Sequence, residues 1–235
     1  MIRRAYPNEL YHHGIKGQKW GVRRYQNPDG SLTTAGKAHH ASNKHADKLH
    51  TKAKSAEPRI TADVRDAVKS TSAKMYGLKN RLKTKQSLAR KIETDAYNDD
   101  ISLEESASKV KDSVRYTALS PDKDFTKNYF AIKKSLEDKG YTETRCKNYF
   151  DLYNQGKVKH KSVQSVFKSP DGQVFELQFH TPSSQNAKNK KVPLYEEARK
   201  PGIDNARLSE IEVKMNDLAK TVFTPPNVYS IKSHG

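Results

Sequence analysis

The chain has 235 residues, of which 34% are hydrophobic, and its 44 Lys and Arg residues against 27 Asp and Glu residues leave a formal net charge of +17. This length suits one ordinary core with appendages, and the mean hydropathy of −0.97 predicts that part of the chain is extended. No apolar run approaches the roughly 18 residues that span a bilayer, and the N-terminus lacks the apolar core of a signal peptide, so we expect a cytoplasmic protein without membrane association.

The positive charge is concentrated toward the N-terminus. Residues 1–90 carry 20 Lys and Arg residues and 6 Asp and Glu residues, whereas residues 91–235 carry 24 and 21. The excess predicts an anionic partner for the first part of the chain, such as nucleic acid, nucleotide phosphates or an acidic protein surface. A solvated basic tail with no fixed partner is the alternative.

Residues 1–40 contain YHHGIKGQKWGVRRYQNPDGSLTTAGKAHH, which is more typical of a flexible docking peptide than of a folded unit. Glycines interrupt any helix there, and Trp20 lies among cations. Paired histidines at 12–13 and 39–40 are a weak metal-binding pattern, because no third ligand stands at a fixed spacing. The string HHGIKGQKWGVRRYQNPDGSLTTAGK resembles a leader of proteins encoded in phage and prophage head-gene regions. That resemblance implies phage capsid proteins as partners of residues 1–40, and association with the virion.

The next part of the chain is predicted to be helical. Residues 41–76 are polar and rich in Ala, Lys and His, and we expect a helical linker that Pro58 interrupts. A second helix begins near Lys85, and a short one follows at 102–111. The apolar residues of the second helix recur at spacings of four: Leu88, Ile92 and Ala96.

Residues 77–222 predict an α/β (α+β) domain. Four segments read as strands, at 113–119, 141–150, 161–167 and 173–180. Helices are expected at 124–138, 183–199 and 204–221, and residues 223–235 are expected to form a C-terminal tail. The interleaved strands and helices, with a hairpin pair, predict a mixed sheet of about four to five strands flanked by helices. The single cysteine, Cys146, excludes an internal disulfide and suits a reducing cytoplasm.

The segment 173–180 separates two kinds of side chain. They form an apolar stripe and a polar stripe, made of Phe175, Leu177 and Phe179 and of Glu176, Gln178 and His180. An edge strand with one solvated face is the simpler interpretation. Because Glu and Gln are poor strand formers, the second hypothesis is that the polar stripe serves chemistry.

Polar residues gather in four clusters at the edges of the predicted elements. The clusters are Arg81, Lys83, Lys85 and Ser87 with Arg90 and Lys91; Asp112 with Arg115; Lys157, Lys159, His160 and Lys161 with Ser162 and Gln164; and the polar stripe itself. Cations beside two carboxylates suit phosphoryl transfer, because carboxylates hold Mg²⁺ while Lys and Arg neutralise phosphate oxygens. The alternatives are a solvated helix face, a local ion pair at a strand entry and an ordinary hydrophilic loop.

In order and spacing these clusters resemble the synthetase domain of RelA/SpoT-type enzymes, which has a nucleotidyltransferase-like fold. RLKTKQSLARK is similar to the family's R-x-K-x-x-x-S-x-x-R-K, and DSVR to D-x-x-x-x-R, with Asp112 and Arg115 closer together and on opposite faces of a strand. HKSVQ is similar to Y-R-S-L-H, with His160 in place of a base-stacking tyrosine. ELQFHT is similar to E-x-Q-x-R-T, with His180 in place of arginine. The likeness spans residues 77–199.

The resemblance implies transfer of pyrophosphate from ATP to the 3′-hydroxyl of a nucleotide or RNA acceptor, with Mg²⁺ as cofactor. Glu176 and Asp112 would hold the ion, and Glu176 and Gln178 would serve catalysis. The residues implied for ATP and its phosphates are Arg81, Lys83, Ser87, Arg90, Lys91 and Arg115. Those implied for the acceptor are Lys157, Lys159, His160, Lys161 and His180.

The compact chain resembles small standalone or toxin-type synthetases, some of which use adenine nucleotides or the 3′ end of tRNA. This implies a phage- or prophage-encoded toxin or alarmone synthetase in the cytoplasm of a host bacterium, with an antitoxin as partner. The departures at Asp112, His160 and His180 leave a second hypothesis, a catalytically inactive phage-head structural or packaging-associated protein that binds nucleotide or nucleic acid. A pure nucleic-acid-binding module would explain the charge but not Glu176 and Asp112.

Overall fold

The computed structural model describes residues 25–27, 29–198 and 202–235, so most of the predicted leader lies outside the described residues. The chain divides into two compact units. The first unit comprises the residues up to Lys52 together with Lys83–Val110, and the second comprises Ala53–Leu82 together with Lys111–Gly235. Each unit therefore combines two separate stretches of chain, whereas the predicted boundaries after residues 40, 76 and 222 cut the chain into consecutive segments.

The first unit is helical, as the sequence predicts. It contains the beginning of α1 (Thr34–Lys69), together with α2 (Lys85–Asp99) and α3 (Leu103–Lys109). Both shorter helices start at a capping side chain, because the hydroxyls of Thr84 and Ser102 accept the backbone N–H groups of the first turn. The small core of this unit consists of Ala46, Leu88, Ala89, Ile92, Ala107 and Val110.

Helix α1 runs through Pro58 without a break, so the predicted interruption at this residue is wrong. Proline removes one backbone hydrogen bond, but the residues that follow it bury a full apolar stripe in the core of the second unit. The stripe consists of Ile60, Val64, Ala67 and Val68. Burial of these four side chains outweighs the local cost of the proline.

The second unit is built around a mixed five-stranded sheet in the order β1-β2-β5-β4-β3. The strands are β1 (Lys74–Met75), β2 (Arg115–Leu119), β3 (Thr142–Asn148), β4 (Val163–Lys168) and β5 (Val174–His180). Strands β2 and β5 are parallel and the other neighbours are antiparallel. The four predicted strands and the mixed sheet are confirmed, and β1 is a short addition. Since β5 lies at the centre of the sheet, the interpretation of segment 173–180 as an edge strand is wrong.

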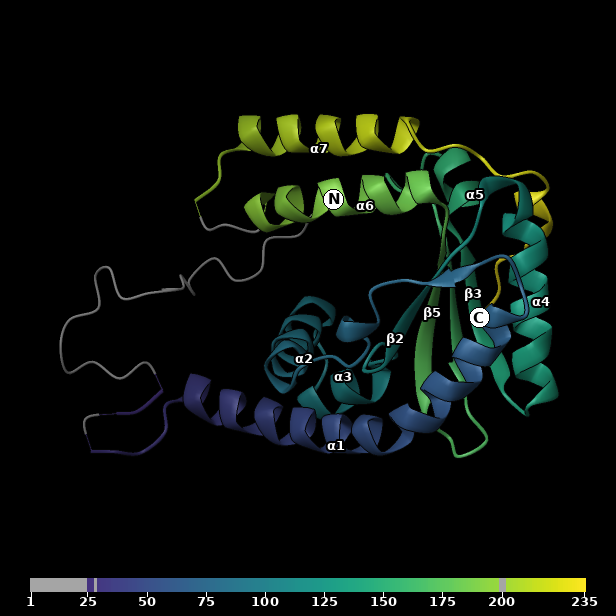
Figure 1. Ribbon diagram of the computed structural model, residues 1–235. Coiled ribbons are helices and arrows are strands. Elements are labelled where there is room, and N and C mark those ends of the chain that lie inside the picture. Colours follow the sequence, from purple (N-terminus) through teal and green to yellow (C-terminus); the bar gives the residue numbers. More distant parts are fainter. Residues whose placement is uncertain (1–24, 28, 199–201) are drawn as a thin grey trace. The chain divides into compact units, whose positions relative to one another are not determined.

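One face of the sheet carries the apolar core. Phe175, Leu177 and Phe179 of β5 are fully buried on this face. They pack with α4 (Phe125–Asp138), for example through the ring of Tyr129, whose centroid lies 5.0 Å from that of Phe179. Figure 1 shows α4 on one side of the strands and α6 on the other. The apolar stripe of the central strand therefore faces the core, as its alternation predicts.

The polar face of the sheet is covered by α6 (Pro182–Ala198), which contacts it through hydrogen bonds. Helix α7 (Asn205–Lys220) packs against α6 through a small separate cluster of apolar side chains. The cluster consists of Ala198, Ile211 and Met215, with Leu194, Ile203 and Leu208 at its margin. Both helices lie where the sequence predicts them.

The predicted C-terminal tail packs into the core of the second unit. Val228 and Ile231 are buried, and the backbone of His234 pairs with that of Cys146 on β3. The side chain of Asn148 caps α5 (Tyr149–Asn154) and also donates hydrogen bonds to the carbonyl oxygens of Val228 and Ile231. Helix α5 and this docking of the C-terminal segment are not apparent in the sequence.

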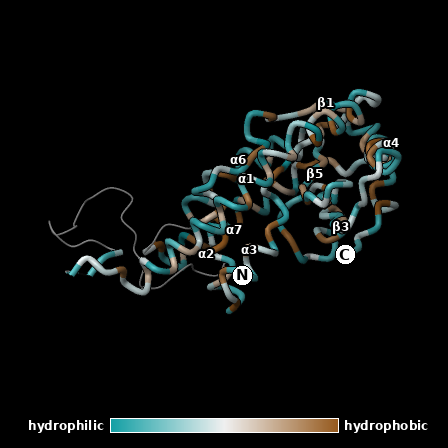
Figure 2. Tube along the Cα trace, turned by 90° about the horizontal axis from the view of Figure 1, so that it is seen from below, coloured by the Kyte–Doolittle hydropathy of each residue, from teal (hydrophilic) through white to brown (hydrophobic). Residues whose placement is uncertain are grey.

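The hydropathy of the chain is low along most of its length. Long hydrophilic stretches, teal in Figure 2, alternate with shorter hydrophobic ones in brown. Within the described residues, no helix is both long enough and apolar enough to cross a membrane.

Candidate active site

The polar stripe of β5 is the centre of a polar sheet face. Glu176, Gln178 and His180 retain only 9%, 5% and 3% of their exposure. Register places Arg115 of β2 beside Glu176 and places Gln164 of β4 beside Gln178. Because directly paired residues point to the same side of a sheet, these five side chains share one face.

A chain of hydrogen bonds orients the carboxylate of Glu176. The amide nitrogen of Gln178 donates to Glu176 Oε1, and Lys188 Nζ of α6 donates to the amide oxygen of Gln178. The two bonds leave the Gln178 amide one orientation, with its N–H group toward the carboxylate. Helix α6 thus takes part in positioning Glu176.

His180 is held as a neutral imidazole on this face. Its Nδ1 lies 2.8 Å from Ser184 Oγ at the start of α6. Burial lowers the pKa of His180 well below its usual value, and the electrostatic influence of Lys188, His160 and Arg115 lowers it further. Its Nε2 is buried and has no hydrogen-bond partner among the described residues.

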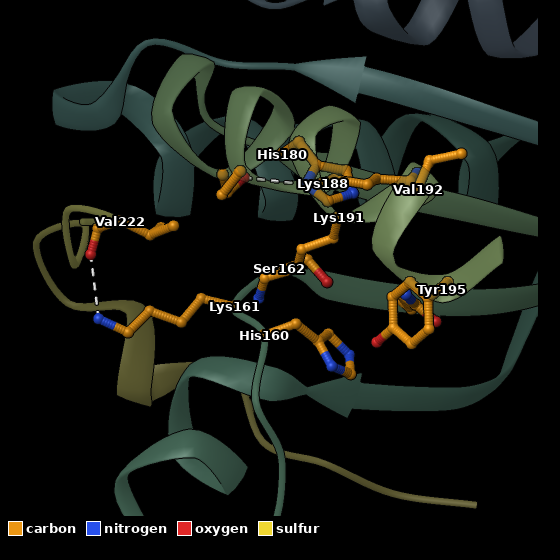
Figure 3. A pocket seen from close by; sticks show the side chains of 12 residues that line it. His160, Lys161, Ser162, His180, Lys188, Lys191, Val192, Tyr195 and Val222 are labelled. Carbon is orange, nitrogen blue, oxygen red and sulfur yellow. Dashed lines mark hydrogen bonds between the residues drawn. The ribbon is translucent and has the colours of Figure 1, made fainter. Parts of the chain in front are cut away.

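A cavity of about 250 Å³ lies between the polar sheet face and α6 (Figure 3). It is lined on the sheet side by His160, Lys161, Ser162, Gln164 and His180, and on the side of the helices by Ser184, Ala187, Lys188, Lys191, Val192, Tyr195 and Val222. Three of the residues predicted to bind the acceptor, namely His160, Lys161 and His180, are therefore brought together around one space. No Asp or Glu occurs among the described residues that line it.

Two of the loop cations, Lys157 and Lys159, are not among the residues that line this cavity. Lys157 is exposed, and Lys159 forms an ion pair with Glu212 on α7 at 2.8 Å. Lys161 donates to the carbonyl oxygen of Val222 at 3.0 Å, although its side chain lines the cavity. The cavity takes its further cations from α6 instead, as Lys188 and Lys191.

Sequence reasoning missed Lys188 and Lys191, although a signal for them exists. The two residues are three positions apart on a predicted helix, so they share one face of it. Their neighbour Lys190 points elsewhere and is exposed. A run of lysines on a closing helix is usually a solvated surface, and only the packing of α6 on the sheet distinguishes the half-buried Lys188 and the buried Lys191 from the exposed Lys190.

Asp112 precedes β2, which begins at Arg115. The opposite-face relation expected from their spacing therefore does not apply, because Asp112 lies outside the strand. It is half-buried in the segment that leads into β2, next to the strand that carries Glu176 in the sheet order.

Arg81 is committed to a structural ion pair. Its guanidinium donates to both carboxylate oxygens of Glu57 on α1 and to the carbonyl oxygen of Leu78. The hydroxyl of Thr61 also donates to Glu57, and it lies 2.7 Å from the hydroxyl of Tyr116. Arg81 would have to exchange Glu57 for a phosphate in order to bind ATP.

Arg115, also predicted to bind ATP, belongs to the second unit, whereas Lys83, Ser87, Arg90 and Lys91 belong to the first. Ser87 is part of the cap of α2, where its backbone N–H donates to Thr84 Oγ1 at 3.2 Å. Arg90 is exposed on α2, and Lys91 forms an ion pair with Asp95 at 2.9 Å. The carbonyl oxygen of Lys83 lies 3.1 Å from the imidazole of His50. The predicted ATP-binding residues are therefore divided between the two units.

Acid is expected to destabilise the site through His160. Burial, together with the charges of Lys191 and Lys188, lowers the pKa of His160 to about 4. Because an unfolded histidine titrates near pH 6.5, the stability that this neutral imidazole provides is present above pH 6.5 and is lost as the pH falls toward 4. Between pH 7 and pH 4.5 we expect a loss of about 2–3 kcal/mol from this group. Urea unfolding of the wild type and of His160→Phe at both pH values measures it, and an equal loss in the two proteins would contradict the expectation.

A comparison with known protein families finds a match for one short segment. Residues 4–27 match a family of unknown function, DUF7211, and no curated protein matches the chain. Most of the matched segment, residues 4–24, lies outside the described residues, and the match gives no support to the resemblance to a phage leader or to capsid partners.

Several solved structures are similar to this chain. One is the Type VI effector Tas1 in complex with its immunity protein, at a TM-score of 0.46 and 15% identity, covering 75% of this chain and 97% of that one. Another is the small alarmone synthetase 1 from Bacillus subtilis bound to its product pppGpp, at 0.41 and 15%, covering 63% and 71%. A third is a GTP pyrophosphokinase family protein from Streptococcus pneumoniae, at 0.46 and 12%, covering 80% and 90%. At such identities the similarity concerns the fold alone.

Proposed function

We propose that this protein transfers pyrophosphate from ATP to the 3′-hydroxyl of a nucleotide or RNA acceptor in a reaction that requires Mg²⁺. The observation that carries the proposal is the position of Glu176. Its carboxylate lies on the polar face of the central strand, oriented by Gln178, in a sheet face that continues into a cationic cavity. Two of the four sequence motifs that resemble a RelA/SpoT-type synthetase lie here: ELQFHT begins on this strand, and HKSVQ contributes to the lining of the cavity.

The carboxylates suit a magnesium ion that is shared with a nucleotide. The described residues contain no group of three or more His, Cys, Asp or Glu side chains that could hold a metal ion. Mg²⁺ commonly binds through one or two carboxylates, with substrate phosphates and water as its other ligands. Glu176 and Asp112 would be these two carboxylates. When bound, the ion neutralises charge on the transferring phosphates.

Glu176 would also accept the proton of the acceptor hydroxyl. The 3′ oxygen forms a bond to the β-phosphorus of ATP while the bond from this phosphorus to the oxygen that bridges it to the α-phosphate breaks, so AMP leaves with that oxygen. A carboxylate is an effective base when it lies within hydrogen-bond reach of the hydroxyl. The hydrogen bond from Gln178 keeps the Glu176 carboxylate in one position, which is what such a role needs.

Cations would bind the phosphates on either side of the reaction. Arg115 lies beside Glu176 on the polar face, where its guanidinium would bind a phosphate of ATP. Charge-assisted hydrogen bonds from such groups are about twice as strong as neutral ones. His160 would lie near the acceptor base. Its imidazole is one of the aromatic rings on which a base can stack. The product of the reaction would be an alarmone or a modified RNA. If this product stops bacterial growth, the protein would act as a toxin, and an antitoxin would be its partner.

The test is an acceptor panel. The protein is incubated with Mg²⁺ and ATP labelled on the γ-phosphate, together with GDP, GTP, ADP, AMP or tRNA. We expect AMP release and transfer of the label to one acceptor, which then names the substrate. Omitting Mg²⁺ should abolish the transfer.

If no acceptor of the panel receives label and no AMP is released, with a protein shown to be folded by circular dichroism, the proposal is contradicted. This result would favour the second hypothesis, an inactive domain that binds nucleotide or nucleic acid. Binding of ATP without turnover, measured on the same preparation, would identify that case directly.

A further inference from the structure

Two lysines of α6 project into the cavity without an ion-pair partner. Lys188 and Lys191 both line it (Figure 3), and Lys191 is only 3% exposed. Neither forms an ion pair with a carboxylate in the described part of the chain. Because buried charges are costly unless they are paired, two unpaired amines in one wall indicate that an anion completes the site.

Most of the hydrogen-bonding capacity of these amines is unused. Lys188 donates to the Gln178 amide oxygen, and Lys191 donates to the carbonyl oxygen of Lys159. An ammonium group has three N–H donors, so each amine keeps two. Burial lowers the pKa of both lysines to about 8; for Lys188 the charge of Arg115 lowers it further, and the carboxylate of Glu176 opposes the shift. A bound anion would offset the desolvation cost that these lowered pKa values reflect, because an opposite charge nearby favours the charged amine.

Two neutral polar atoms in the same wall also have no partner. His180 Nε2 and Ser162 Oγ are buried without a hydrogen bond in the described residues, and their residues are 3% and 0% exposed. Ser184 Oγ lies 2.8 Å from His180 Nδ1, closer than its 3.2 Å to the carbonyl oxygen of Thr181. If the Ser184 hydroxyl donates to Nδ1, then the remaining proton of His180 is on Nε2, which becomes a donor. A buried donor without a hydrogen bond costs about 1–3 kcal/mol. These atoms therefore indicate a ligand that carries many hydrogen-bond acceptors.

The size of the cavity limits how much of a ligand it encloses. Sites that enclose a whole small molecule measure about 300–1,000 Å³, whereas this cavity measures about 250 Å³. It therefore accommodates one end of a nucleotide. A phosphate end matches the walls, because Lys188 and Lys191 line the space and carboxylates are absent from its described lining.

We propose that Lys188 and Lys191 bind a phosphate group of the acceptor in this cavity, with Ser162 and His180 as additional donors. The proposal rests on the proposed function for the identity of the ligand. It assigns the acceptor phosphate to α6 in place of Lys157 and Lys159 of the loop, which are exposed or paired with Glu212.

The test measures binding without turnover. Inorganic pyrophosphate, GDP, ADP and the nucleosides guanosine and adenosine are titrated into the full-length protein in the absence of ATP, by isothermal calorimetry. We expect pyrophosphate and at least one nucleoside diphosphate to bind in competition with each other, and the nucleosides to bind at least tenfold more weakly than that diphosphate. Lys188→Met and Lys191→Met should each weaken binding about tenfold or more, the effect of losing one charge-assisted hydrogen bond. Lys190→Met, an exposed neighbour on α6, is the matched control and should bind like the wild type.

Thermal unfolding separates a binding role from a structural one. Pyrophosphate should raise the melting temperature of the wild type and of Lys190→Met, and the rise should be lost in the double variant Lys188→Met, Lys191→Met. If the double variant still binds pyrophosphate like the wild type, or if nucleosides bind as tightly as diphosphates, the proposal is wrong. Pyrophosphate that no nucleotide displaces would also overturn it, because the site would then serve a free anion. If pyrophosphate binding depends on the two lysines but no acceptor of the panel receives label, the phosphate site is supported and the proposed transfer reaction is wrong.

Discussion

Glu176→Gln is expected to lower the rate of pyrophosphate transfer by a factor of about 10²–10⁴, the range for loss of a general base. Glutamine has the same shape and keeps an oxygen that accepts the hydrogen bond from Gln178, so the polar face should remain assembled. It carries no negative charge, and it neither accepts a proton nor holds Mg²⁺ as a carboxylate does. The measurement is AMP release at saturating acceptor, with kcat and KM determined separately.

Glu196→Gln is the matched control for this experiment. Glu196 lies on α6 in the same unit and is exposed, so the variant should retain the kinetics of the wild type. A Glu176→Gln protein that changes only KM would place Glu176 in substrate binding instead of in proton transfer. Wild-type kinetics in the Glu176→Gln protein would remove it from the mechanism altogether.

Phe175→Ala is expected to destabilise the second unit by about 3–5 kcal/mol. Phe175 is fully buried on the apolar side of β5. Its ring lies between 5.7 and 5.8 Å from the rings of Tyr116, Tyr141 and Phe167. Removing it leaves a cavity among three aromatic side chains that the strands hold in place, so little relaxation is available. Urea unfolding followed by circular dichroism gives the free energy of unfolding.

Phe130→Ala provides the comparison, at an exposed position of α4 in the same unit. Phe130 is 45% exposed on α4, so its removal should cost less than about 1 kcal/mol. If the two units unfold in separate transitions, only the transition of the second unit should move in Phe175→Ala. Equal losses in the two variants would show that the aromatic cluster around β5 does not carry the stability that its burial indicates.

The sequence was most informative where local pattern and burial agree. Strand β5 could be predicted from alternation alone, and α2 from Leu88, Ile92 and Ala96, all of which are buried. The misses have one physical cause, since each depends on partners distant in the chain. Strand β1 has two residues and exists because Met75 pairs with Ala118. Pro58 is tolerated because the helix that contains it is held by the core.

The same division applies to the site. Side-chain alternation determines that Glu176, Gln178 and His180 share a face, because successive residues of any strand point to opposite sides. Whether that face meets solvent or another element is a tertiary fact, and the strand order places β5 at the centre with α6 over it. Arg81 carries the same charge whether it binds a phosphate or Glu57, and only the fold shows that Glu57 is within reach.

By itself, then, the sequence determined strands β2 to β5, helices α2, α3, α4, α6 and α7, and the polar stripe with its Glu176, since each of these follows from the spacing of neighbouring residues. The tertiary structure alone decided which cations surround the cavity. The sequence does not distinguish among five lysines, namely Lys157, Lys159, Lys188, Lys190 and Lys191. Of these five, only Lys188 and Lys191 line the cavity beside His180. The reason is that a helix presents one face to the sheet on which it packs, and the choice of that face depends on contacts between segments that are far apart in the chain.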